Sequence, residues 1–151
     1  MTSRIHPIAG TVGLLTVLTF WTSTVLSELS GSKAAIVAVK QAIPWGLPIL
    51  VLALAITGGT GFRLAGDSAM PDILAKKRRM PFIAGNGLLV LIPSAITLAV
   101  LVDRDEFGPL FYGVQALELL AGATNIVLMS LNVRDGFRVT GRFGKRSPAR
   151  G

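Results

Sequence analysis

Glu118 is the ionisable residue that lies deepest in an apolar stretch of this chain, and residues around it share its face of a helix. Gln115, Gly122, Asn125 and Met129 stand at spacings of three or four from one another and from Glu118. Charged side chains inside a membrane are costly and normally face the interior of a helix bundle. Glu118 is therefore a candidate for accepting protons or for binding a ligand.

The same carboxyl group also has a structural interpretation. An unpaired carboxylate in hydrocarbon takes up a proton, and the neutral group would then only hold helices together. Lys40 could instead reach it, because a lysine can extend its stem along apolar surface and pair through its ammonium group. The hydroxyl groups of residues 22–24 are further candidate partners. The sequence leaves both interpretations open.

Two asparagines enter apolar runs from opposite directions and reach a similar depth. Asn86 lies four residues after Phe82, where one run begins, and Asn125 approaches the same end from Leu110. We expect a hydrogen bond between the two amides. Such a bond between membrane helices is worth about 0.6–2 kcal/mol, so we interpret the pair as a link between helices.

His6 and Met80 could ligate a haem iron. Each stands directly before a proline that leads into an apolar run, and histidine with methionine is a known axial pair. Arg4, Arg78 and Arg79 lie beside them and could meet the haem propionates. The chain has one histidine, so bis-histidine ligation of haem b would need His6 from two copies. The alternative is an interfacial histidine and an apolar methionine at two helix starts.

Several other kinds of chemistry are excluded by composition. The chain contains no cysteine, so it cannot form disulfides, cysteine-ligated zinc sites or iron–sulfur clusters. A nucleophile elbow, a Walker loop, a zinc signature and a glycine-rich dinucleotide fingerprint are also absent from the sequence.

The elements that must position these residues are four long apolar runs. They cover about residues 8–28, 41–62, 82–102 and 110–131 of a 151-residue chain with a mean hydropathy of +0.63. Each is about 20 residues long, which is enough for a helix to cross a bilayer. We predict an all-α membrane protein, a four-transmembrane-helix bundle that forms one domain over residues 1–140. Residues 141–151 are predicted to be a basic, disordered cytoplasmic tail.

An internal repeat is also predicted. Ile8-Ala9-Gly10 recurs as Ile83-Ala84-Gly85, and Gly61-Phe62-Arg63 recurs as Gly136-Phe137-Arg138, both at an offset of 75 residues. One match starts a helical hairpin and the other ends it. We therefore expect two tandem hairpins related by a pseudo-two-fold axis along the membrane normal. Coincidence in an apolar chain of biased composition is the alternative.

The charges predict orientation. Twelve of the 15 lysines and arginines flank the first run, separate the second run from the third, or follow the fourth, and three lie on the other side. Cytoplasmic loops carry the excess of basic residues, so both termini are predicted to be cytoplasmic. This topology accounts for the basic composition without nucleic acid as a partner. Anionic lipid headgroups would attract residues 76–79 and the tail.

The layout resembles that of small four-helix bacterial inner-membrane proteins, such as the four-helix protoporphyrinogen oxidases and copper-resistance membrane domains. The features that carry the resemblance are His6 at the head of the first run, Trp21 further along it, and basic residues before later runs. The resemblance covers the apolar part of the chain and implies a four-helix architecture, a location in a bacterial inner membrane and a bound haem. Those families carry further histidine, lysine or arginine ligands that have no matched positions here.

Three functions are compatible with the sequence. The one that the sequence favours is a non-catalytic membrane subunit or assembly protein that contacts other membrane subunits or forms a homodimer, because no catalytic set of residues is visible; the other two are alternatives. The second is a membrane redox protein linked to haem or quinone through His6, with Met80 or across a dimer. The third is a small transporter or proton pathway that uses Glu118. The sequence leaves open whether the chain is an enzyme.

Overall fold

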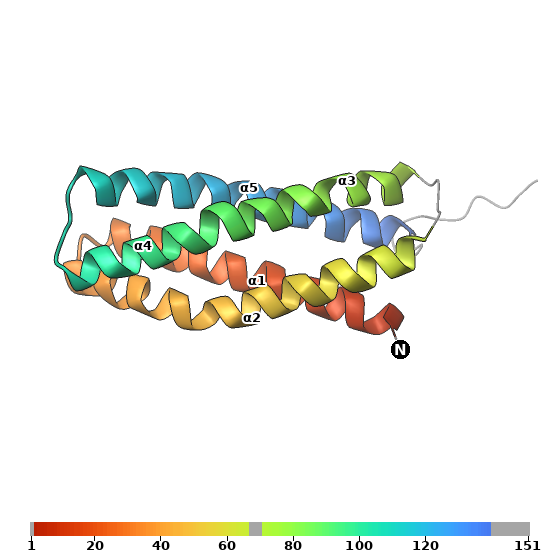
Figure 1. The fold of residues 1–151 in the computed structure, drawn as a ribbon, viewed down its shortest axis with the longest axis horizontal. Coiled ribbons are helices and arrows are strands. Elements are labelled where there is room, and N and C mark those ends of the chain that lie inside the picture. Colours follow the sequence, from red (N-terminus) through yellow and green to blue (C-terminus); the bar gives the residue numbers. More distant parts are fainter. Residues whose placement is uncertain (1, 67–70, 140–151) are drawn as a thin grey trace, which may run out of the picture.

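The computed structural model describes residues 2–66 and 71–139, without the side chains of residues 2–4, 64, 65, 72 and 139. Its helices are α1 (Thr2–Leu29), α2 (Lys33–Ala65), α3 (Pro71–Asn86), the π-helix η1 (Gly87–Leu91), α4 (Ile92–Asp103) and α5 (Pro109–Val139). The segments α3, η1 and α4 form one continuous rod, called the third span below (Figure 1). The predicted tail, residues 141–151, lies outside the described residues.

The predicted four-helix architecture is confirmed. Four helical spans are long and apolar enough to cross a membrane. The helices extend past the apolar runs at most ends, because charged residues can continue a helix into the headgroup layer; the second, for example, begins at Lys33 instead of residue 41. Large apolar side chains face outward, as lipid requires; Trp45 is 85% exposed and Leu89 is 78% exposed.

The spans alternate in direction and form two hairpins (Figure 1). The loops at residues 30–32 and 104–108 lie at one end of the bundle, called the hairpin end. The start of α1, the end of α2, the start of α3 and the end of α5 lie at the other, called the basic end. Gly31 and Asp105 adopt positive φ at the two tight loops, and the Asp105 loop closes through Glu106 N–H donating to Leu101 O.

Packing closes the bundle into a four-sided arrangement. α1 packs against α2 and α5, and the third span packs against the same two helices. The third span crosses the bundle diagonally: α3 lies beside α5, whereas α4 lies mainly beside α2 (Figure 1). Apolar side chains fill the core near the hairpin end; they are Ile36, Leu98, Leu101, Val102 and Phe111.

The π-helix in the third span has a local cause. Pro93 has no N–H, and its ring would clash with the carbonyl group four residues earlier in a regular α-helix. One turn widens instead, and the N–H of Ile92 donates to Gly87 O, five residues back. The widened turn directly follows Asn86, one of the two asparagines expected to bond to each other.

The pseudo-two-fold repeat stays a prediction. Two hairpins are present, but residues matched by the proposed repeat differ in their surroundings. Ile8 is 63% exposed, whereas its counterpart Ile83 is 2% exposed. A pseudo-symmetric pair of hairpins would place these two side chains in similar environments.

Close approach of α1 and α2 depends on Gly46. A Cβ atom added there would lie 2.4 Å from the ring of Phe20. We predict that Gly46→Leu lowers the free energy of unfolding by about 1–3 kcal/mol, because overpacking forces the helices apart. Thermal unfolding in mild detergent measures the change. Gly59→Leu is the matched control, since a Cβ atom at Gly59 meets nothing within 4 Å. Equal effects of the two substitutions would contradict the prediction.

Candidate functional site

A stripe of buried polar side chains runs along the inward face of α5. Its members follow one another at spacings of three to seven residues, which keep them on one helix face; they are Gln115, Glu118, Asn125, Asn132 and Asp135. The 20 residues from the first to the last correspond to about 30 Å of helix. The stripe therefore has the length of a membrane span.

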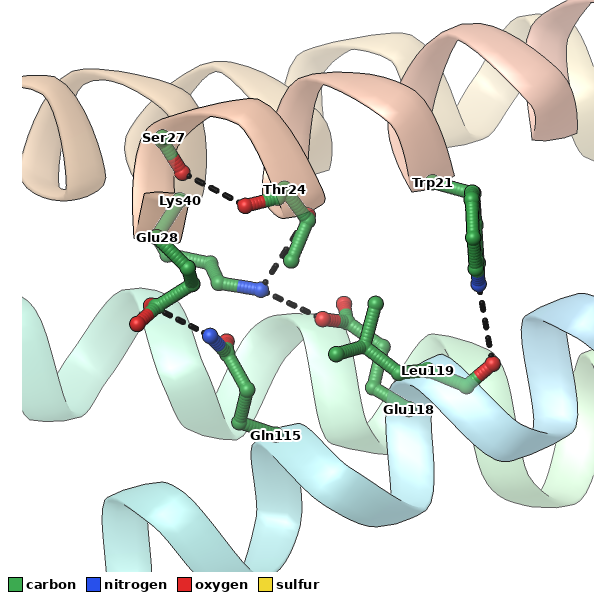
Figure 2. Close-up of polar contacts among 8 residues, drawn as sticks. All are labelled: Trp21, Thr24, Ser27, Glu28, Lys40, Gln115, Glu118 and Leu119. Atoms are coloured by element: carbon green, nitrogen blue, oxygen red, sulfur yellow. Dashed lines mark hydrogen bonds and ion pairs between the residues drawn. The ribbon is translucent and has the colours of Figure 1, made fainter. Parts of the chain in front are cut away.

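Glu118 is the residue of this stripe that carries a charge inside the apolar run, and its carboxylate forms an ion pair. Lys40 of α2 is 1% exposed, and its ammonium group contacts the Glu118 carboxylate of α5, which is 9% exposed. Lys40 Nζ also donates to Thr24 Oγ1 of α1 at 3.3 Å (Figure 2). One ion pair thus joins three helices inside the bundle.

A second polar contact lies between this pair and the hairpin end. Gln115 Nε2 donates to the Glu28 carboxylate (Figure 2), and Glu28 is partly exposed. Gln115 Oε1 is buried and has no hydrogen-bond partner among the described residues. A buried amide oxygen without a partner is costly and marks a place where water or a ligand group would bind.

A pocket lies in the core of the bundle, on the side of the ion pair that faces the basic end. All four spans line it, through Val17, Phe20, Trp21, Ile43, Leu47, Leu50, Leu91, Ala95, Glu118, Leu119 and Gly122. Its volume is about 40 Å³, which is room for a few water molecules. Glu118 is the charged residue in this lining and gives the pocket its acidic group.

Trp21 forms one wall of the pocket and is fixed from two directions. Its indole Nε1 donates to Leu119 O at 3.0 Å (Figure 2). A Cβ atom at Gly122 would lie 3.0 Å from Trp21 Cδ1, so the glycine lets the ring lie against α5. Gly122 in the predicted stripe therefore provides space for an aromatic ring.

The expected contact between the two asparagines is present in the middle of the bundle. Asn86 Nδ2 donates to Asn125 Oδ1 at 2.9 Å and to Ala121 O at 2.8 Å. Asn125 is fully buried, and its own Nδ2 donates to Ile83 O at 3.3 Å. These bonds join the third span to α5 beside the π-helix.

At the basic end, the polar stripe of α5 meets the third span again. Arg79 donates to the buried carboxylate of Asp135 at 2.6 Å, and Arg134 lies 3.1 Å from the same carboxylate. Asn132 contacts both Arg79 and the sulfur of Met80. Apolar composition alone does not single out Asn132 and Asp135, because both follow residue 131, where the apolar run ends. Their spacing from Asn125 continues the helical pattern and could have shown them.

His6 and Met80 do line one pocket, between α1, α2 and α3. His6 Nδ1 lies 3.1 Å from Thr57 O, so it must carry the proton and donate; Nε2 then accepts from Lys76 Nζ at 2.9 Å. Met80 Sδ lies 3.7 Å from Asn132 Nδ2. The atoms that would bind iron are thus engaged with protein groups.

Of the arginines expected to bind the haem propionates, the two with described side chains do not line the His6–Met80 pocket as a haem site would require. Arg79 is paired with Asp135, Arg78 is exposed, and the side chain of Arg4 lies outside the described ones. The His6–Met80 pocket has a volume of about 30 Å³, far below the 300–1,000 Å³ of sites that enclose drug-sized ligands. This arrangement does not fit a haem, so haem binding stays a prediction from sequence alone. The described residues also contain no cluster of three or more histidines and acidic residues that could hold a metal ion.

No protein-family model, curated protein or solved structure matches this chain. The resemblance to four-helix bacterial inner-membrane proteins therefore stays an expectation. The function has to be argued from the buried polar groups themselves.

The ion pair gives a direct prediction about stability. Lys40→Met should lower the free energy of unfolding by about 3–5 kcal/mol, because Glu118 must then either stay in the core as an uncompensated charge or take up a proton to be buried there. Lys40→Met/Glu118→Met should recover most of that loss, since apolar side chains of similar volume replace both charges. Unfolding in mild detergent, run as a double-mutant cycle, measures the coupling. Additive effects of the two single substitutions would show that the pair is not coupled.

Proposed function

We propose that this protein is a small transporter or proton pathway in which Glu118 binds the proton and Lys40 is its counter-ion. The observation that carries the proposal is the position of this ion pair. It is buried inside the bundle, between a partly exposed polar contact and a core pocket. An ionisable residue within a membrane span, facing the bundle interior, is typical of proton relays and transport sites.

Protons would reach the Glu118 carboxylate from the hairpin end of the bundle. Glu28 is partly exposed and bonds to Gln115, which precedes Glu118 by one helical turn on the same face. A proton that reaches Glu118 converts its carboxylate to a neutral acid and removes the ion pair. The Lys40 ammonium then keeps only its contact with Thr24 among the described contacts, so the protonated state is costly and short-lived. Release of the proton restores the pair.

The path toward the basic end is closed in this conformation. The apolar side chains of Val17, Leu50, Ile83 and Met129 pack together between the core pocket and the His6 pocket. Beyond them lie Asn132 and Asp135, which continue the polar stripe. This arrangement supports stepwise transfer with a conformational change, because an open pore would need a continuous polar lining.

A non-catalytic membrane subunit is the second candidate. It is supported by large exposed apolar side chains on all four spans, among them Leu15, Trp45, Leu89 and Leu120. In that role these surfaces would contact lipid or other membrane subunits, and the Lys40–Glu118 pair would serve to fix the helices. The two candidates differ in what neutralising Glu118 does to proton movement.

Proton flux into liposomes separates them. Wild-type protein, reconstituted with a trapped pH-sensitive dye and driven by a potassium diffusion potential, should acidify the lumen faster than empty vesicles do. Glu118→Gln should slow this flux by about tenfold or more, because the amide cannot take up the transferred proton. Asp103→Asn is the matched control: this exposed carboxylate bonds to Gln41 near the hairpin end, and its loss should leave the rate unchanged.

Two results would count against the transport proposal. A folded wild-type protein with no flux above that of empty vesicles would leave the subunit candidate. Flux retained in Glu118→Gln would show that another group binds the proton. Thermal unfolding of each variant before reconstitution confirms that a lost flux is not a lost fold.

A further inference from the structure

A second pocket opens at the basic end, about 30 Å along the bundle from the Lys40–Glu118 pair, since its Gly61 follows Lys40 by 21 residues of α2. It is lined by residues from α1, α2 and α3; they are His6, Gly61, Phe62, Ile73, Lys76, Lys77 and Met80. Both charged residues in this lining are lysines. Phe62, Ile73 and Met80 in the same lining are apolar, so the pocket combines cationic groups with an apolar surface.

His6 orients the first lysine without cancelling its charge. Its Nδ1–H donates to Thr57 O at 3.1 Å and is also 3.0 Å from Thr60 Oγ1. Nε2 accepts from Lys76 Nζ at 2.9 Å, so this nitrogen carries no proton and the ring is neutral. A neutral histidine therefore fixes the ammonium group in place. The acidic residue whose charge also acts on Lys76 is Asp135, which is itself paired with Arg79 and Arg134.

The second lysine is held by the end of α2. Lys77 Nζ donates to Gly66 O at 2.5 Å, where α2 ends. A cation is favourable at a helix C-terminus, so this contact also places the charge without cancelling it. Gly61 lets α1 approach α2 here, since a Cβ atom at that residue would lie 3.0 Å from His6 Cε1.

The depth of the pocket matches that of lipid headgroups. Phe62 and Phe82 are both exposed and mark the edge of the apolar surface on α2 and the third span. Lys76 precedes Phe82 by six residues, or about 9 Å of helix. The headgroup layer extends roughly 5–8 Å beyond the hydrocarbon on each side, and a lysine side chain spans the remaining distance.

We infer that the mouth of this pocket binds the headgroup of one anionic phospholipid, since the pocket itself, at about 30 Å³, is too small to enclose a lipid. The phosphate accepts hydrogen bonds from the ammonium groups of Lys76 and Lys77, and the start of an acyl chain lies against Phe62. Basic pockets between membrane helices are typical sites for anionic headgroups. The opposite charge of the phosphate and the apolar wall below the lysines together favour a lipid over a free anion. This site is independent of the proposed transport function.

Lipid titration of the purified protein tests the site. Thermal unfolding in non-ionic detergent is followed with phosphatidylglycerol, with phosphatidylcholine, and with inorganic phosphate at the same concentration. Wild-type protein should bind phosphatidylglycerol more tightly than phosphatidylcholine. Each lysine contributes about 1 kcal/mol, or about fivefold, so Lys77→Gln should reduce the preference about fivefold. Lys76→Gln/Lys77→Gln should abolish it.

Lys33→Gln is the matched control. Lys33 lies at the hairpin end, exposed and paired with Asp105 at 2.5 Å, and its loss should leave the lipid preference unchanged. If the double variant does not fold, Lys77→Gln alone decides, because Lys77 bonds only to a carbonyl group among the described contacts. Equal binding of the two lipids by wild-type protein overturns the inference. The inference is also overturned if the lysine variants keep the lipid preference. It is overturned as well if inorganic phosphate stabilises the protein as much as phosphatidylglycerol does.

Discussion

Inside hydrocarbon no water can satisfy a polar group, and the Lys40–Glu118 ion pair is the place where this constraint is most severe. Neither charge could be buried there alone, because an unpaired ion in a low-dielectric interior is too costly. The pair therefore requires α2 and α5 to lie at a fixed register, with Thr24 of α1 completing the contact. Trp21 and Gly122 fit together on the adjacent turns. The arrangement of these three helices follows from two charges that must meet.

The need to pair buried polar groups also fixes the position of the third span, at two other depths in the bundle. Asn86 meets Asn125 in the middle of the bundle, and Arg79 meets Asp135 at the basic end. The π-helix between Asn86 and Pro93 keeps the span continuous where a proline would otherwise interrupt its hydrogen bonds. Polar contacts thus recur along α5 with apolar layers between them. A bundle built in this way is closed at rest, and movement of one layer must disturb the helix contacts of the next.

The sequence predicts the architecture well and the polar partners only in part. Apolar runs of membrane length determine four helices, and helical spacing indicates that Glu118 and Asn125 share an inward face. Lys40 could be named as a partner because a buried carboxylate needs one. Asp135 could not be found from the apolar runs, since hydropathy places it outside the membrane, although its spacing continues the stripe. The pairing of His6 with Lys76 could not be predicted, because it depends on how α1 and α3 approach each other across α2.

The central claim is that Lys40 and Glu118 form an ion pair inside the membrane. Solid-state NMR on the full chain in lipid bilayers tests it, with ¹⁵N-labelled lysine and ¹³C-labelled glutamate, and with Glu118→Gln to assign the carboxyl signal. We predict strong dipolar coupling between Lys40 Nζ and the Glu118 carboxyl carbon, at a chemical shift typical of an ionised carboxylate. A Glu118 carboxyl signal with no coupling to a lysine nitrogen would contradict the account.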